Sequence, residues 1–447
     1  MPKITIIKGN VVTPRGVLYG GFVEVTDDVI TAVCSSDVMV PTLESKQQEF
    51  QEAQKEKGTV SAGDSVSIAF EVLDSQFVIP GFVDIHNHGV GGCDEVCDHW
   101  MYPEVSQRYL ARCGTLSTLA SIIFSKARSD AVKKVIETVE ASVGKVIENG
   151  CVIEGIHAEG PIIQDNGGLP AVENDPSLED FKALCKTMPS MKVMTISPTR
   201  EALCGYKRLQ HLLEIGVRPS LGHDRVASEE AILGALRLVR QSSGRLHSTH
   251  MCNVMSFHHR EPSLINFLLC SQLPRSTKYQ GMLVPTLEII GDLIHVHPVV
   301  VQSVLSARNA SEVAVISDCI SSHEPGKRLK YNGRTITVRA EGGCYLCDQF
   351  GRPTKTLAGS TVTLADQFFT LLTYFRLDVV TACMLLATTP ANIANIGHRV
   401  GSLEVGKKAN ILLINGELNT IQRRMVYGRW VQADPYRMLR PSSSHLQ

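Results

Sequence analysis

The chain has 447 residues, of which 43% are apolar and 20% are charged, and its formal net charge is −1. This length is enough for a barrel domain of about 250 residues with a smaller unit beside it. The nearly balanced charge argues against a nucleic-acid partner, and no uncharged apolar run reaches the roughly 18 residues of a membrane-spanning helix.

Cysteine usage and the N-terminal residues bear on the compartment. The 13 cysteines are scattered and lack the two CxxC pairs of a zinc ribbon, so we expect reduced thiols rather than a disulfide framework. The first residues lack the apolar core of a signal peptide. Together these features predict a cytoplasmic protein.

The first half of the chain changes character at Val78. Residues 3–34 contain three short strand-like runs with turns between them, and residues 43–66 form a polar segment that we interpret as a surface insertion or mobile loop. From Val78 onward, short apolar runs alternate with segments of helical spacing such as 229–241 and 298–307. This alternation predicts βα units and a parallel sheet. The candidate strands are 77–85, 116–124, 152–157, 192–196, 216–221, 245–249, 281–290 and 313–317.

The last part of the chain returns to β structure. The dipeptide Asn332-Gly333 suits the tight turn of a hairpin, helical patterns follow at 364–375 and 379–386, and strand-like runs resume after residue 406. Because chain ends often lie close together, we expect the first and last strands to pair.

We therefore predict an α/β fold with two domains. The larger is a (β/α)₈ TIM-like barrel, and the smaller is a β-sandwich formed from both ends of the chain. The predicted limits are residues 77–399 for the barrel and residues 1–76 with 400–447 for the β-sandwich.

Polar side chains follow the predicted barrel strands where each strand ends. His86 and His88 come after the first strand, and alternation along an extended backbone projects both imidazoles to one face. The carboxyl ends of barrel strands form the mouth in which such enzymes keep their active sites. The other residues in equivalent positions are Glu159, His223, His250 and Asp318.

This set of side chains favours a hydrolytic metal site. Imidazoles with one or two carboxylates suit Zn²⁺, which lowers the pKa of a bound water to about 7. Asp318 is the candidate base that takes the water's proton and returns it to the leaving nitrogen. Each residue alone could be a helix cap or a satisfied core side chain, but six of them after five strands favour a metal site.

Longer motifs connect the chain to a known family. The stretches are Pro80–His86, Gly155–Pro161, Leu221–His223, Thr249–Met255, His258–Pro262, Asp292–Pro298, Ser317–Asp318 and Leu357–Ser360. With these the sequence resembles the N-acetylglucosamine-6-phosphate deacetylases, a branch of the amidohydrolase superfamily, from Val78 to about Leu413. The resemblance implies an enzyme of amino sugar metabolism that removes acetate from N-acetylglucosamine 6-phosphate and leaves glucosamine 6-phosphate.

The resemblance also implies roles within the site. Glu159, His223 and His250 match the family's invariant metal ligands, and Asp318 matches its catalytic acid/base. Family members that have a His-x-His pair after the first strand can hold a second ion. We therefore expect one or two divalent ions per subunit, zinc by preference, with Glu159 bridging a pair.

The family's substrate contacts match Asn253, the backbone at Val254, Arg260, His295 and the loop Leu357-Ala358-Gly359. Arg260 suits a phosphate because its planar guanidinium can donate two parallel hydrogen bonds. In the family this arginine reaches the phosphate bound by the neighbouring subunit. The resemblance thus implies a homodimer that binds a small sugar phosphate.

Two departures from the family pattern concern the substrate. Leu169 stands where a histidine usually touches the sugar, and Thr199 stands where the family has a carboxylate. An amidohydrolase acting on a different N-acyl sugar or on a cyclic amide therefore stays an alternative.

Other activities fit the residues less well. Cyclic-amide hydrolases commonly bridge their metals with a carboxylated lysine, whereas the third strand here offers Glu159. Deaminases typically place His-x-x-Glu after the fifth strand, whereas His223 is followed by Asp224-Arg225-Val226. A non-catalytic barrel scaffold is a third alternative, which the retained ligands disfavour.

Overall fold

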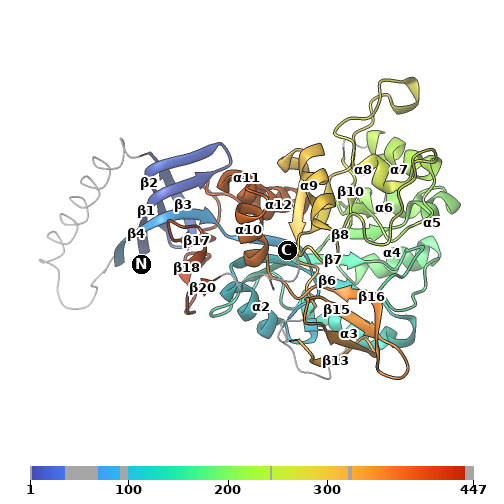
Figure 1. The fold of residues 1–447 in the computed structure, drawn as a ribbon, viewed down its shortest axis with the longest axis horizontal. Coiled ribbons are helices and arrows are strands. Elements are labelled where there is room, and N and C mark those ends of the chain that lie inside the picture. Colours follow the sequence, from blue (N-terminus) through green and yellow to red (C-terminus); the bar gives the residue numbers. More distant parts are fainter. Residues whose placement is uncertain (1–2, 36–68, 91–98, 242–243, 321–324, 438–447) are drawn as a thin grey trace, which may run out of the picture.

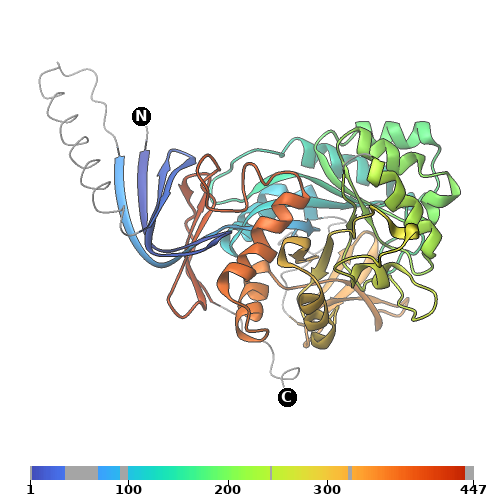
Figure 2. The same ribbon diagram turned by 90° about the horizontal axis from the view of Figure 1, so that it is seen from above.

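The computed structural model describes residues 3–35, 69–90, 99–241, 244–320 and 325–437. The predicted insertion at 43–66 lies outside these residues. Within them, none of the helices combines the length and apolar character needed to cross a bilayer. A sheet built from both chain ends lies at one end of the long axis, and the parallel strands with their helices lie beside it (Figures 1 and 2).

Parallel strands carry the core of the larger domain. Six of them form one curled sheet in the chain order β5 to β10, and β11 and β12 form a separate parallel pair. Backbone hydrogen bonds link the pair to both edges of the sheet: Thr286 N–H donates to Leu246 O at 3.0 Å, and Asp318 N–H donates to His86 O at 2.9 Å. The predicted barrel is confirmed in part, in its parallel strands and their order. The bounds are β5 Phe82–Asn87, β6 Thr115–Ile123, β7 Val152–Glu159, β8 Met191–Ile196, β9 Arg218–Leu221, β10 His247–Ser248, β11 Leu287–Ile290 and β12 Val313–Ile316.

Helices cover the outside of these strands, so β5, β6 and β7 are buried at every position. The predicted helices at 229–241 and 298–307 are confirmed. The second of them begins with proline at its first position, and the His297 side chain accepts a hydrogen bond from Val299 N–H. The helices are α2 Pro103–Arg112, α3 Ser129–Glu140, α4 Leu178–Lys186, α5 Pro198–Leu203, α6 Lys207–Glu214, α7 Glu229–Gln241, α8 Leu264–Leu268, α9 Pro298–Ala307, α10 Leu364–Thr373, α11 Val379–Cys383 and α12 Thr389–Ile393.

Two predicted strands are wrong in their extent. The run 77–85 is divided, because β4 ends at Pro80 and β5 begins at Phe82. Gly81 lies between them, and a Cβ at this position would approach the Leu116 side chain to 2.4 Å. The run 281–290 becomes a strand only at Leu287.

The strands from both chain ends form one eight-stranded sheet in the order β19-β18-β17-β4-β1-β2-β3, with β20 paired to β18. Strands from both ends of the chain therefore share one sheet, joined by the antiparallel pairing of β4 with β17. The sheet is one hydrogen-bonded layer rather than the predicted sandwich, because β1, β2 and β4 are long and β1 carries bulges near Gly9 that bend it over a shared core. The bounds are β1 Lys3–Thr13, β2 Gly16–Thr26, β3 Val29–Cys34, β4 Ala69–Pro80, β17 Ile411–Ile414, β18 Thr420–Val426, β19 Arg429–Trp430 and β20 Tyr436–Arg437.

A four-stranded antiparallel sheet follows the last barrel strand. The predicted hairpin is confirmed, and Asn332 and Gly333 have φ angles of 50° and 76°, as a type I′ turn requires. Only this hairpin was predicted; β15 and β16 were not. The strands are β13 Arg328–Tyr331, β14 Arg334–Val338, β15 Cys344–Cys347 and β16 Pro353–Gly359.

A buried carboxylate joins the small sheet to the parallel strands. Glu154 of β7 is 4% exposed, and its Oε1 accepts hydrogen bonds from Ser117 Oγ at 2.8 Å and from Tyr427 Oη at 2.7 Å. Arg399 Nη2 lies 3.5 Å from Glu154 Oε2. Since Tyr427 directly follows β18, this cluster links the eight-stranded sheet to the parallel strands.

We expect Tyr427→Phe to lower the free energy of unfolding by about 1–3 kcal/mol, because a buried carboxylate loses one donor while the ring is kept. Urea denaturation followed by circular dichroism measures this change. Tyr19→Phe is the control, since Tyr19 is 72% exposed. Equal stability of the two variants would contradict the role given to Tyr427.

Candidate active site and metal centre

The predicted ligands of the first ion converge on one carboxylate. Glu159 ends β7 and is 2% exposed, and its Oε1 lies 3.0 Å from both His223 Nε2 and His250 Nε2. The two imidazole nitrogens are 3.1 Å apart. Ligand atoms around a tetrahedral ion with bonds of about 2.1 Å lie about 3.4 Å apart. These three side chains can therefore hold a divalent ion.

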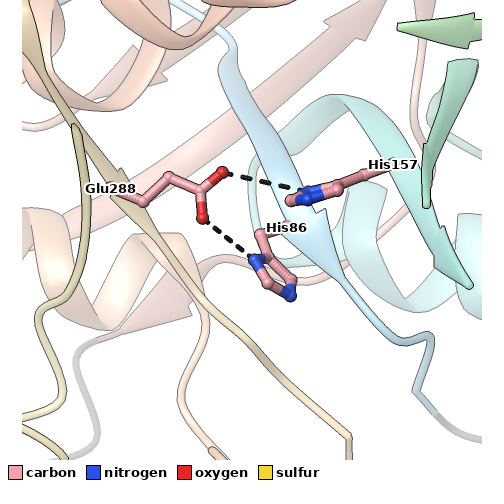
Figure 3. Close-up of side chains that lie close together, drawn as sticks. All are labelled: His86, His157 and Glu288. Atoms are coloured by element: carbon pink, nitrogen blue, oxygen red, sulfur yellow. Dashed lines mark hydrogen bonds and ion pairs between the residues drawn. The ribbon is translucent and has the colours of Figure 1, made fainter. Parts of the chain in front are cut away.

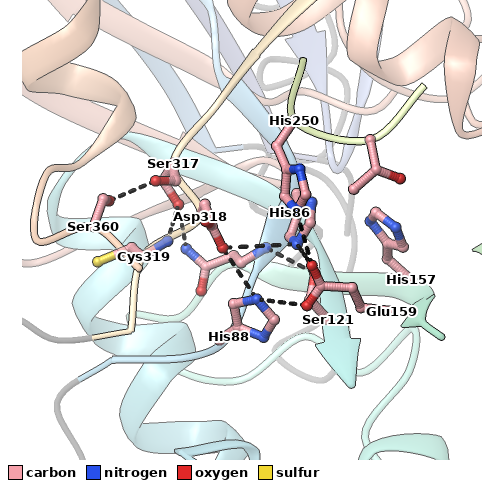
Figure 4. Close-up of polar contacts among 12 residues, drawn as sticks. His86, His88, Ser121, His157, Glu159, His250, Ser317, Asp318, Cys319 and Ser360 are labelled. Carbon is pink, nitrogen blue, oxygen red and sulfur yellow. Dashed lines mark hydrogen bonds and ion pairs between the residues drawn. The ribbon is translucent and has the colours of Figure 1, made fainter. Parts of the chain in front are cut away.

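The two histidines at the end of β5, His86 within the strand and His88 just after it, face the same carboxylate. His86 Nε2 lies 3.6 Å from Glu159 Oε1, and His88 Nε2 lies 3.4 Å from Glu159 Oε2. Figure 4 shows both rings pointing toward Glu159, as expected for residues two apart on a strand. The three residues form a second group able to hold an ion, so Glu159 is shared by two such groups.

Buried atoms without hydrogen bonds mark where an ion fits. Among the residues that the structure describes, His86 Nε2 and Glu159 Oε2 are buried and have no hydrogen-bond partner. His86 Nδ1 donates to Glu288 Oε2 at 2.9 Å, and His223 Nδ1 donates to the Asp165 carbonyl at 2.9 Å. In its neutral form, each ring therefore keeps its lone pair on Nε2, the atom that faces the site. The residues present fit a metal ion.

The backbone turns sharply where these residues leave their strands. His223, His250 and Asp318 have φ angles of 51°, 24° and 46°. A left-handed conformation costs a residue other than glycine on the order of 1–3 kcal/mol. Backbone hydrogen bonds to all three carbonyls hold these turns, and the side chains are thereby directed into the mouth.

Asp318 lies beside the β5 histidines. Its Oδ1 is 3.1 Å from His88 Nε2 and 3.7 Å from His86 Nε2. Burial opposes the charge, but the hydrogen bond from His88 and the nearby His86 imidazole hold the pKa of Asp318 below its ordinary value. The side chain is therefore a carboxylate at neutral pH, which is the form that a general base requires.

A cavity with a volume of about 290 Å³ is lined by His88, Glu159, His223, His250 and Asp318. All the predicted substrate contacts except Arg260 also line it, and so does Leu169, where the family pattern has a histidine. The contacts are Asn253, Val254, His295, Leu357, Ala358 and Gly359.

The buried side chain of His295 can carry a positive charge within this cavity. Its Nδ1 lies 2.6 Å from Asp292 Oδ2. Burial disfavours the imidazolium, but the charge of Asp292 outweighs it and raises the pKa of His295. A histidine of this kind suits an anionic group of a ligand.

Arg260 is exposed and does not line the cavity; its Nε donates to His259 Nε2 at 3.1 Å. Its predicted contact with a neighbouring subunit stays a prediction. Sequence reasoning missed Arg225 and Lys355, which do line the cavity. It also missed Glu288, whose signal was a carboxylate inside the apolar run of β11.

Comparison with known proteins agrees with the resemblance. The N-acetylglucosamine-6-phosphate deacetylase of Bacillus subtilis is 27% identical over 356 residues, which covers 77% of this chain and 82% of that protein. The N-acetylgalactosamine-6-phosphate deacetylase of Escherichia coli O157:H7 is 22% identical over 380 residues, covering 82% of this chain and 90% of the relative.

Solved structures show the same fold. The crystal structure of N-acetylglucosamine-6-phosphate deacetylase from Pasteurella multocida matches with a TM-score of 0.73 at 20% identity, covering 96% of this chain and 99% of the other. No family model matches the sequence. The chain is similar over most of its length to deacetylases of the amidohydrolase superfamily, and the resemblance is confirmed.

We expect the purified protein to contain a divalent ion and His250→Ala to lose most of it, because one of three donors around Glu159 Oε1 is removed. Elemental analysis after dialysis measures the content. His398→Ala is the control, an exposed histidine outside the cavity. A His250→Ala protein with the metal content of the control would refute the ligand role.

Proposed function

We propose that this chain hydrolyses the acetamido group of N-acetylglucosamine 6-phosphate to acetate and glucosamine 6-phosphate. The observation that carries the proposal is the convergence of Glu159 and four imidazoles beside Asp318, in a cavity formed at strand ends. The similarity to deacetylases of phosphorylated N-acetyl sugars supports the choice of substrate. We also propose the complete (β/α)₈ barrel as the scaffold.

We propose that the metal site holds two ions, zinc by the type of its donors. Glu159, His223 and His250 would hold one ion, and His86 and His88 would hold the other together with Glu159. When bound, such an ion polarises the amide carbonyl and makes water a stronger nucleophile near neutral pH. A side chain of the protein carries out the proton transfers.

Asp318 has the position and charge of the general base. Its Oδ1 accepts a proton from the attacking water as the water oxygen adds to the amide carbon. The protonated carboxyl then returns that proton to the nitrogen as the carbon–nitrogen bond breaks, which releases acetate and the amine. Asp318 Oδ1 lies 3.1 Å from His88 Nε2, so the carboxylate stands directly beside a proposed ligand atom, where the attacking water would be activated.

The remaining residues of the cavity would hold the sugar phosphate. We propose that His295, Asn253 and the backbone at Val254 contact the phosphate end, and that Leu357–Gly359 contact the sugar. Arg260 would complete the phosphate site of a neighbouring subunit, so we propose a homodimer. The exposure of Arg260 is consistent with such a reach. The scattered cysteines support a cytoplasmic location for the homodimer.

A second candidate substrate is another N-acetylated sugar phosphate, such as the N-acetylgalactosamine 6-phosphate named for one relative. Leu169 favours this possibility, because an apolar side chain lines the cavity where a histidine would contact the sugar. The rates of acetate release from N-acetylglucosamine 6-phosphate and N-acetylgalactosamine 6-phosphate at equal concentrations show which is the better substrate.

We expect Asp318→Asn to lower kcat for acetate release by about 10²–10⁴-fold, because an amide cannot accept the proton of water. Metal content should match the wild type. Asp130→Asn, at an exposed position of α3, is the control for removal of one carboxylate. Full activity of the Asp318→Asn protein would refute the acid/base role.

We expect Arg260→Ala to raise KM for the phosphorylated sugar by about 10–100-fold, since one charged hydrogen bond contributes about 1.5–3 kcal/mol. The slower reaction of N-acetylglucosamine without phosphate should not change. Arg275→Ala, another exposed arginine, is the control. Equal effects of Arg260→Ala on both sugars would refute the proposed contact between Arg260 and the phosphate.

A further inference from the structure

A carboxylate lies below the metal site, inside the ring of strands. Glu288 of β11 is fully buried, and each of its oxygens receives hydrogen bonds. Its Oε2 accepts from His86 Nδ1 at 2.9 Å and from the backbone N–H of His250 at 3.1 Å. Its Oε1 accepts from His247 Nε2 at 3.2 Å. Two of these three donors belong to residues of the proposed metal site.

The cluster of Glu288 with His86 and His157 is itself compact enough to suggest another ion site (Figure 3). The hydrogen bonds argue otherwise. His157 Nδ1 donates to the carbonyl of Ile85 at 2.9 Å, and His86 Nδ1 donates to Glu288. The nitrogens that face Glu288 therefore carry hydrogens rather than lone pairs, and an ion has no place between them.

Burying a carboxylate without compensation costs several kcal/mol, so a position of this kind in a barrel interior calls for a reason. Here the charge decides which nitrogen of His86 carries the hydrogen. A carboxylate has no proton to offer at neutral pH and can only accept, so Nδ1 of His86 must donate. Nε2, the atom 3.6 Å from Glu159 Oε1, is then left with its lone pair.

We propose that Glu288 is a positioning residue that sets the tautomer and ring orientation of His86, and through it the affinity of the metal site on β5. The same oxygen accepts a hydrogen bond from the backbone of His250, so Glu288 ties a ligand from β5 to a ligand that follows β10. This inference rests on the proposed metal site and names a residue that acts on metal binding without touching the ion.

The substitution Glu288→Gln removes the negative charge of this side chain and keeps its shape. The glutamine amide can donate to Nδ1 of His86, which would move the ring hydrogen to Nε2 and block that ligand. Zinc affinity, measured by competition with a chromophoric chelator and without any substrate, should fall by about 10–100-fold for the site that includes His86. The absorption spectrum of the Co²⁺-substituted protein should change with it.

Glu154→Gln is the matched control, because Glu154 is also a buried carboxylate that accepts two side-chain hydrogen bonds but does not line the cavity. We expect it to lose stability and to keep the zinc affinity of the wild type. If Glu288→Gln only destabilised the fold, zinc affinity would fall in proportion to the unfolded fraction. Circular dichroism at the same temperature measures that fraction.

The decisive experiment repeats Glu288→Gln in a His86→Asn protein. If Glu288 acts through His86, the second substitution should change the remaining zinc affinity by less than about twofold. A tenfold loss in both backgrounds, or wild-type zinc affinity in Glu288→Gln alone, would overturn the proposal. A protein with Glu288-dependent zinc binding that releases no acetate would refute the proposed function and leave this inference standing.

Discussion

The rest of the site depends on a carboxylate that is buried among imidazoles. Burial would raise the pKa of Glu159, but His86, His223 and His250 hold it well below its ordinary value. A buried charge of this kind is stable only when its partners reach it from several directions. The strands must therefore end together, and the backbone must turn at His223 and His250 to bring the rings in.

The polar character continues below the site, where barrel interiors are commonly filled by branched apolar residues. His157 Nε2 meets Thr195 Oγ1 at 3.0 Å, and Thr195 Oγ1 lies 2.8 Å from Thr249 Oγ1. Thr249 in turn lies 2.6 Å from Ser220 Oγ. Burial, followed by the nearby His86, lowers the pKa of His157 to about 3, so this ring is neutral. A network in which each member has its partner favours one arrangement of the strands that carry the ligands.

Periodicity and motifs predicted the parallel strands, the helix over 229–241 and the residues around Glu159, because these signals are local or lie at strand ends. What they could not predict depends on contacts between distant segments. The close approach of Leu116 leaves room only for glycine at position 81, and the bend of the small sheet comes from bulges in β1. Glu288 was overlooked for the same reason, since its donors stand about 40 and about 200 residues away along the chain.

The cavity is formed by two pieces of the fold that meet at Asp318, whose carbonyl accepts a hydrogen bond from Ser360 N–H just after β16. Its floor, with the residues that carry the chemistry, belongs to the parallel strands, whereas the segment 355–359 belongs to β16 of a separate antiparallel sheet. We expect changes in that sheet away from Ser360 to alter the lining of the cavity without displacing the residues of the parallel strands. Substrate preference can thus diverge among descendants of one ancestor while their hydrolytic machinery is inherited intact.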